Sequence, residues 1–189
     1  EKNSQGGLTF VSRLFVYDVA TGRITATHRV NTFGPVVWHH DKVLIGGLRP
    51  VVLQAPAMTE RGRIEALDNT IKAVAVHPTR DLFIIGGDGG AVSFVNGNGT
   101  LTASLVSTGN GEWISAASDG TYRSSLDGAR ALAWSFAGPL EGFSFERFAA
   151  RFDNPKGLGE RLLGDLTQST LALSRPPQLT FKEDVRHII

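Results

Sequence analysis

The sequence contains no cysteine among its 189 residues. This absence excludes disulfide bonds, thiolate metal sites and a cysteine nucleophile on this chain. No apolar run reaches the length of about eighteen residues that a transmembrane helix needs, so we expect no membrane insertion. An excess of charge of one sign is also lacking, because 19 basic and 18 acidic residues leave a net charge of +1. That balance argues against nucleic acid as a partner.

The first seven residues are polar and lack the basic and then apolar pattern of a signal peptide. Residues 8–12 already have the composition of a strand, and no methionine precedes them. We therefore expect the true start of the protein to lie upstream. The sequence is compatible with either a cytoplasmic or a periplasmic location.

The chain does contain a repeated strand unit with a period near 40 residues. The run Val43-Leu44-Ile45-Gly46-Gly47 is matched 40 positions later by Phe83-Ile84-Ile85-Gly86-Gly87. Four residues also recur at intervals of 36, 41 and 40, and these are Tyr17, Leu53, Phe94 and Trp134. A fixed period of this length in strand-type sequence is typical of propeller blades.

Short runs of β-branched and aromatic residues between turn residues define the expected strands. Asn-Gly and Asp-Gly pairs between them suit tight hairpins, because both residue types tolerate positive φ. The predicted strands are 8–12, 14–19 and 23–30, then 36–39, 43–45, 51–54 and 63–67, then 72–77, 82–85, 91–95 and 100–106, and finally 113–117, 121–125 and 131–136. Three to four such units are too few to close a ring of blades readily. They predict a partial propeller with an unprotected apolar flank. A twisted β-sandwich is the alternative.

The period changes after residue 142. Phe145, Phe148, Ala149 and Phe152 form a helical stripe, with Ser144 as a candidate N-cap. A second helix is expected after the cap residue Asn154, with a terminating glycine at position 164. Its buried face would consist of Leu158, Leu162 and Leu163.

The fold class is therefore predicted to be all-β with a short helical C-terminal region. Residues 7–140 would form the last blades of a propeller, and residues 141–166 a helical bracket packed on it. Residues 167–189 contain Arg175-Pro176-Pro177 and would form an extended linker into a missing downstream domain.

Two stretches resemble WD-repeat propellers. Residues 14–24 (LFVYDVATGRI) resemble the strand and turn usually written around the Trp-Asp dipeptide, with Tyr17-Asp18 in its place. Residues 74–95 resemble the strands that precede this motif in the family's repeat, with His77-Pro78 where the family often has Ser-Pro. The resemblance covers roughly residues 8–136 and implies a WD-like propeller.

The C-terminal part is similar to the segment that joins such a propeller to a caspase-like peptidase domain in bacterial multidomain proteins. The similar stretches are residues 111–136, 143–165 and 175–177, in that order. This chain departs from the family pattern in two places, since the turn before Tyr122 lacks its proline and Asp153-Asn154-Pro155 stands where the family has Arg-Pro. The family's catalytic Cys and His belong to the peptidase domain and match no position here.

No set of residues predicts catalysis, a metal or a cofactor. Adjacent histidines on a strand point to opposite faces, so His39 and His40 do not suit one ion. The glycines at 86–90 precede a strand pattern, whereas phosphate loops require a helix directly after them. Residues 96–99 lack the carboxylates of a calcium loop, and no G-x-S-x-G motif occurs.

Aromatic and arginine side chains near the C-terminal end are the candidate partner-binding residues. They are Trp113, Tyr122, Arg123, Trp134, Arg147 and Arg151.

We expect a non-catalytic protein-interaction or sensor module, the propeller part of a larger protein associated with a caspase-like peptidase. Its partners would be other proteins and an adjacent domain or chain that completes the propeller. One alternative is a propeller-type hydrolase with a metal or carboxylate site in its channel. Another is a structural half-propeller completed by another chain.

Overall fold

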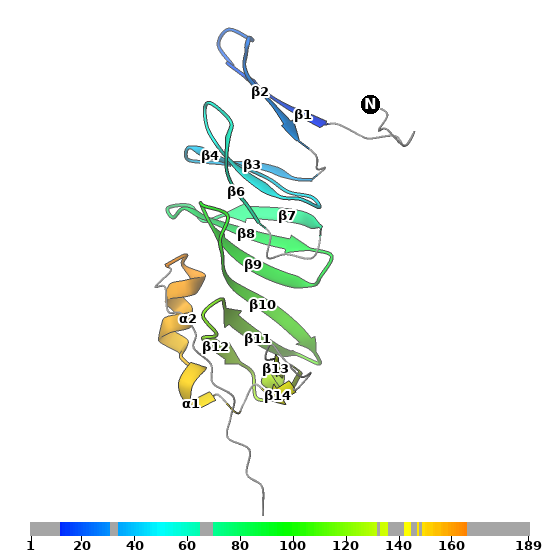
Figure 1. Cartoon of the computed structure of the whole chain (residues 1–189), viewed down its shortest axis with the longest axis vertical. Helices are drawn as coiled ribbons and strands as arrows, with labels where there is room; N and C mark the ends of the chain where they lie inside the picture. The colour runs from blue at the N-terminus through cyan, green and yellow to red at the C-terminus, as the bar shows by residue number, and fades with distance from the viewer. Residues whose placement is uncertain are drawn as a thin grey trace, which may run out of the picture.

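The computed structural model describes residues 12–30, 34–64, 70–131, 133–135, 142–144, 147 and 149–165. The first two sheets are a hairpin, β1 (Ser12–Tyr17) and β2 (Ile24–Val30), and a four-stranded meander of β3 (Val36–His39), β4 (Lys42–Ile45), β5 (Val51–Gln54) and β6 (Thr59–Arg63). The hairpin, the meander and a third, six-stranded sheet follow one another along the long axis of the molecule (Figure 1).

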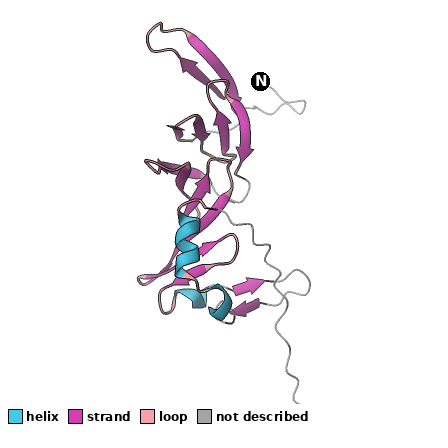
Figure 2. Cartoon of the chain, turned by 90° about the vertical axis from the view of Figure 1, so that its left-hand side faces the viewer, coloured by secondary structure: helices cyan, strands magenta, loops and turns pink. Residues whose placement is uncertain are grey.

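The third sheet also runs up and down in chain order. Its strands are β7 (Ile71–Val76), β8 (Leu82–Gly87), β9 (Ala91–Asn96), β10 (Leu101–Gly109), β11 (Glu112–Ala117) and β12 (Tyr122–Ser124). A 3-10 turn, η1 (Gly128–Ala131), and a small hairpin, β13 (Ala133–Ser135) and β14 (Gly142–Ser144), follow it. Two short helices, α1 (Ala149–Phe152) and α2 (Pro155–Leu162), lie beside the last strands (Figures 1 and 2).

The central strands of the four-stranded sheet, β4 and β5, are buried on both faces, which explains their unbroken apolar runs. Successive side chains of a strand point to opposite faces. On β4, Val43 and Ile45 pack in one cluster with Leu14 and Val16 of the hairpin. The intervening Leu44 packs in a second cluster with strands of the six-stranded sheet. The apolar interior therefore consists of two successive layers, one on each side of this sheet.

The same alternation continues in the six-stranded sheet. Phe83, Ile85 and Val95 face the four-stranded sheet and are fully buried. The opposite side of the six-stranded sheet, which we call the outer face, carries Ile84 and Phe94, which lie opposite each other across β8 and β9. The successive meanders thus pack face to face as propeller blades do, and the predicted class, all-β with a short helical C-terminal region, is confirmed.

The register corrects the proposed alignment of repeat positions. Leu44 lies opposite Val52, and its counterpart Ile84 lies opposite Phe94. Phe94 therefore corresponds to Val52 and not to Leu53, which packs towards the hairpin. The spacing is 40 residues on one strand and 42 on the next because the paired part of β8 and β9 extends one pair further beyond Ile84 and Phe94 than that of β4 and β5 beyond Leu44 and Val52.

Two strand predictions differ from the structure. The strand that follows β5 in the four-stranded sheet is β6, because the chain reverses at Ala55–Met58 and returns at once as an exposed, polar edge strand. Most of the predicted strand 63–67 lies outside the described residues. The predicted fourth unit is not separate, since β11 pairs directly with β10. Asn110 and Gly111 both have positive φ, the geometry of a primed hairpin turn, and this turn extends the third sheet.

The helix predictions are partly confirmed. Asn154 caps α2 by accepting a bond from Gly157 N at 3.0 Å, and Gly164 follows the helix with a φ of 88°. Ser144 is not an N-cap, because it lies in β14, and α1 begins only at Ala149. Phe145 and Phe148 lie outside the described residues. Leu163 is exposed and not part of the buried face, because it sits at the C-cap where the helical turn ends.

Candidate interaction surfaces

The outer face of the six-stranded sheet carries an uncovered apolar area. On one side of β10, Leu105 lies opposite Val92 of β9. On its other side, Ser107, two residues later in β10, lies opposite Trp113 of β11. Val92, Leu105 and Trp113 are each 37–38% exposed. Together with Gly90 they line a depression of about 500 Å³. We call the set Gly90, Val92, Leu105, Ser107 and Trp113 the apolar strip.

Helix α2 covers a neighbouring area of the outer face, around Phe94, Ala103 and Ala117. Leu158 packs with Ala103 and Ala117, which lie opposite each other on β10 and β11. Phe94 and Leu162 complete the contact. The helix therefore takes the place that the next sheet would occupy, but only over one end of these strands.

A buried ion pair fixes α2 on the sheet. Arg161 Nε donates to Asp119 Oδ2 at 2.8 Å, and the two side chains are 8% and 9% exposed. Burial alone would raise the pKa of the Asp119 carboxyl, but hydrogen bonds from Thr121 and Arg161 outweigh burial and hold the pKa below its ordinary value. The Asp119 carboxylate is thus held charged by the turn that begins β12 and by the helix.

Helix α1 lies on the opposite side of the same sheet. Phe152 packs with Ile114 and Tyr122, which face the interior side. Between the two helices the chain passes the free edge of β12, where Asp153 forms a parallel bridge with Tyr122 and Asn154 N donates to the Tyr122 carbonyl at 3.3 Å. Residues 152–158 therefore clasp the edge of the sheet from both sides.

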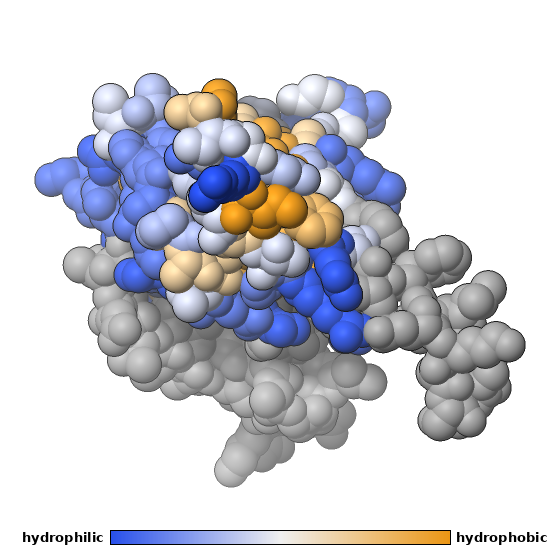
Figure 3. Space-filling view, turned by 90° about the horizontal axis from the view of Figure 1, so that it is seen from above, coloured by the Kyte–Doolittle hydropathy of each residue, from blue (hydrophilic) through white to orange (hydrophobic). Residues whose placement is uncertain are grey.

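The hairpin carries a second uncovered surface at the other end of the stack. Phe15, Tyr17 and Ile24 are 44–55% exposed and point away from the four-stranded sheet, with Tyr17 opposite Ile24. We call these three residues the hairpin face. Seen from this end, the molecule shows apolar areas among hydrophilic side chains (Figure 3). Both ends of the stack thus expose apolar sheet surfaces.

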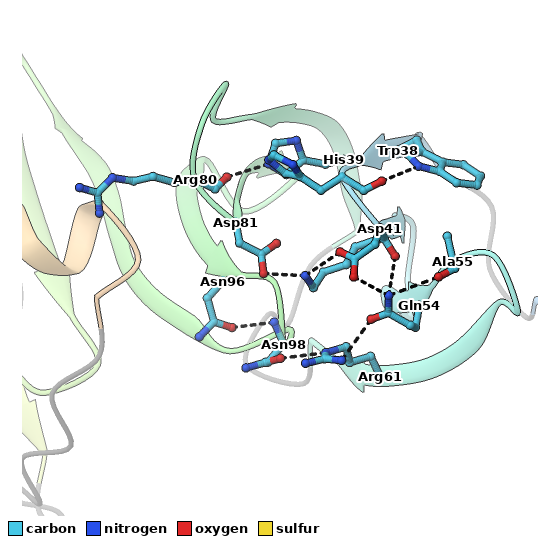
Figure 4. A network of polar contacts seen from close by, with 12 residues as sticks. Trp38, His39, Asp41, Gln54, Ala55, Arg61, Arg80, Asp81, Asn96 and Asn98 are labelled. Atoms are coloured by element: carbon cyan, nitrogen blue, oxygen red, sulfur yellow. Dashed lines mark hydrogen bonds and ion pairs between the residues drawn. The ribbon is translucent and has the colours of Figure 1, made fainter.

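A polar network holds the four-stranded and the six-stranded sheet together at one rim (Figure 4). Lys42 Nζ lies 2.7 Å from Asp81 Oδ2 and 3.1 Å from Asp41 Oδ1. Gln54 donates to Asp41 at 2.7 Å, and Arg61 joins Gln54 to Asn98 across the two sheets at 3.1 and 3.0 Å. Every member of the network has a protein partner, so the network serves the fold.

The charges of this network stabilise each other. The Gln54 hydrogen bond and then Lys42 lower the pKa of Asp41 from 3.8 to about 2. Burial by itself would lower the pKa of Lys42, but Asp81 and Asp41 outweigh burial and raise it.

The structure places three of the predicted partner-binding residues on β11 and β12. Trp113 belongs to the apolar strip. Arg123 lies opposite Ser115 and extends towards Asp153, 3.7 Å away. Tyr122 is buried against Phe152 and is not presented to solvent.

The other three predicted residues are not among the residues that line the strip. Trp134 is in β13, opposite Phe143. The guanidinium of Arg147 lies over the Phe143 ring at 5.4 Å, and that of Arg151 over the Phe152 ring at 5.2 Å. The structure therefore does not bring the six residues together into one site.

Trp113 is the one residue of the strip that the sequence predicted, and its apolar neighbours Val92 and Leu105 were missed. Val92 follows Ala91 and Leu105 precedes Val106, and two adjacent apolar residues do not indicate which of them lies on an uncovered face. The pairing of Val92 and Leu105 across β9 and β10 could have indicated a shared face, but the sequence does not reveal how far α2 extends over it.

The described residues contain no group of three or more histidine and acidic side chains able to hold a metal. His39 Nε2 lies 2.7 Å from the Arg80 carbonyl, and the ring of His40 meets that of His39 edge-on. His39 thus links β3 to the turn before β8. Within the described residues no helix is long and apolar enough to cross a bilayer.

Comparison with known proteins gives likeness of shape only. No family model matches the sequence, and no curated protein matches it. The computationally designed Ika4 protein is similar over 60% of this chain and 78% of its own, with 17% identity and a TM-score of 0.43. BamB from Moraxella catarrhalis is similar over 55% of this chain and 36% of its own, with 15% identity and a TM-score of 0.38.

The computationally designed Ika8 protein is similar over 60% of this chain and 40% of its own, with 17% identity and a TM-score of 0.39. The chain thus spans well under half the length of BamB and of Ika8.

Proposed function

We propose that this chain is a non-catalytic protein-interaction module, the propeller part of a larger protein. The observation that carries the proposal is the pair of uncovered apolar surfaces at the two ends of the sheet stack. When a partner covers an exposed cluster such as Val92, Leu105 and Trp113, the burial lowers the free energy by about 25 cal/mol per Å² of apolar surface.

The partner of such a surface is a protein. The strip is apolar and lines a depression on a sheet surface, so it suits another sheet or an amphipathic helix and has no donor set for a small polar ligand. Its tryptophan is of the residue type that most often dominates binding energy at interfaces.

The downstream partner we propose is a caspase-like peptidase domain, and the support is the resemblance of residues 111–136, 143–165 and 175–177 to the segment that precedes such domains. The bracket is suited to this role because Asp165, the last described residue, is held by Arg161 and lies 3.4 Å from Arg80. A WD-like origin of the sheets likewise belongs to the proposal. The peptidase assignment predicts a domain with Cys and His in caspase-like order downstream of this chain in the full-length protein.

Site-specific photo-crosslinking in the full-length protein tests the proposal. A photoreactive residue replaces Leu105 in the strip, and in a matched control it replaces Leu126, which is 88% exposed in a turn. We expect a crosslink to polypeptide from position 105 and none from position 126. Equal reaction with solvent at both positions would show that nothing covers the strip.

The non-catalytic part of the proposal has its own measurement. Purified chain is assayed against peptide, ester and phosphate substrates, and its metal content is determined. We expect no turnover. Hydrolysis together with stoichiometric calcium or zinc would replace the interaction module with the propeller-type hydrolase.

A further inference from the structure

We propose that the occupant of the apolar strip is the hairpin face of a second copy of this chain, and that two copies associate head to tail. This inference rests on the proposed function and identifies the partner of the same surface. It starts from the internal repeat, which shows what covers an outer face of this kind. Leu44 and Val52 form the surface of the four-stranded sheet that corresponds to Ile84 and Phe94 of the outer face.

At the internal interface this surface is fully covered. Leu44 and Val52 are 0% exposed because the next sheet places Phe83, Ile85 and Val95 against them. The covering surface is therefore the side of a sheet that points back towards the hairpin end. An occupant of the outer face should present the same side of a sheet.

The hairpin face is that side of the first sheet. Phe15, Tyr17 and Ile24 point away from the four-stranded sheet, as Phe83 and Ile85 point away from the outer face. The hairpin and the outer face lie at opposite ends of an elongated stack, so one molecule does not bring them together (Figure 1). Two molecules can do so twice, with the head of each on the tail of the other.

The dimensions and charges of the two surfaces agree with this pairing. The hairpin has only two strands, which suits the limited part of the outer face that α2 leaves open. Residues 12–30 carry three arginines and one aspartate. Two acidic residues lie beside the strip in the sequence: Asp88, which also pairs with Lys72, and Glu112, which also accepts a hydrogen bond from Asp127 N. A head-to-tail contact that repeats twice closes a ring. With the small β13–β14 hairpin left aside, two copies would supply six stacked sheets, within the range of about four to eight blades of propellers.

The test measures the mass of the chain in solution by sedimentation over a range of concentrations. We expect a dimer at twice the 20.3 kDa chain mass. Leu105→Asp and Phe15→Asp place a charge in one face each, so each variant alone should weaken the dimer by about 100-fold. The matched control Val19→Asp, in a turn residue that is 99% exposed, should leave the dimer unchanged.

Mixing the two variants distinguishes head-to-tail association from a symmetric contact. The Leu105→Asp copy keeps its hairpin face and the Phe15→Asp copy keeps its strip, so the mixture should recover a 1:1 dimer. Circular dichroism checks that each variant retains its β-structure.

The proposal is overturned if the unmodified chain is monomeric, if either variant alone stays dimeric, or if the mixture shows no recovery. A monomer that still crosslinks from position 105 to another protein would leave the interaction module standing and remove only the second copy as its partner.

Discussion

The four-stranded sheet and the six-stranded sheet share a repeat but differ in what covers them. The four-stranded sheet has a sheet on each face, and its side chains Leu44 and Val52 are wholly buried. The corresponding side chains of the six-stranded sheet, Ile84 and Phe94, are half-buried. A helix with a buried ion pair covers one end of that face, and the other end is open. Burial at a repeat position therefore depends on the neighbouring element as well as on the residue.

The largest expected effect contrasts equivalent positions in the two sheets. Leu44→Ala should lower the free energy of unfolding by about 4 kcal/mol, because it opens a cavity between two sheets. Ile84→Ala should cost about 1 kcal/mol, since part of this side chain is already hydrated. Urea denaturation measures both values. Equal losses would show that the outer face is covered in solution.

The next effect concerns the helix that covers the end sheet. Arg161→Ala should cost about 3 kcal/mol, because it leaves the Asp119 carboxylate buried without its partner. Arg151→Ala, at an exposed position of α1, is the matched control and should change stability by less than about 0.5 kcal/mol.

A double variant makes this test decisive. If the ion pair holds α2, then Asp119→Ala combined with Arg161→Ala should cost less than the sum of the two single changes. Strict additivity would contradict a direct coupling between the two side chains.

The smallest expected effect concerns pH and the network between the sheets. The folded state lowers the pKa of Asp41 from 3.8 to about 2, so protons bind more tightly to the unfolded chain. The resulting stabilisation is present above about pH 4 and is lost as the pH falls through about 2. Thermal unfolding followed between these pH values should show a smaller decrease in the melting temperature for Asp41→Asn than for the unmodified chain.

Gln54→Ala serves as the companion variant. It removes the hydrogen bond that contributes most to the Asp41 shift, so it should reduce the acid-induced loss in the same direction. An unchanged acid profile in both variants would assign the acid sensitivity to other carboxyl groups, such as Asp119.

Local patterns predicted much of this fold. The strands β3 and β5 match the sequence prediction, and so do the cap at Asn154 and the glycine after α2, because each depends on residues close in the sequence. The polar strand β6 was misplaced, since an exposed edge has little apolar signal. The merging of the third and fourth units depends on pairing between β10 and β11, which short apolar runs do not specify.

The candidate surface was predictable only in part. Trp113 was selected for its residue type, whereas Val92 and Leu105 depend on which half of a sheet face a later helix covers. Tyr122 was expected at a surface because aromatic residues favour interfaces, but α1 and η1 bury it. Tertiary packing decided each of these outcomes.

The clasp of residues 152–158 around β12 has a consequence for aggregation and for mechanical load. A free strand edge invites pairing with strands of other molecules, and here the backbone of Asp153 and Asn154 occupies that edge. A pulling force applied to the chain beyond Asp165 would first have to break the Arg161 anchor and then peel the clasp from the edge. The bridge to Asp153 therefore opposes edge-to-edge pairing of β12 with another molecule. The same contacts fix the position of the chain up to Asp165 against load applied from beyond it.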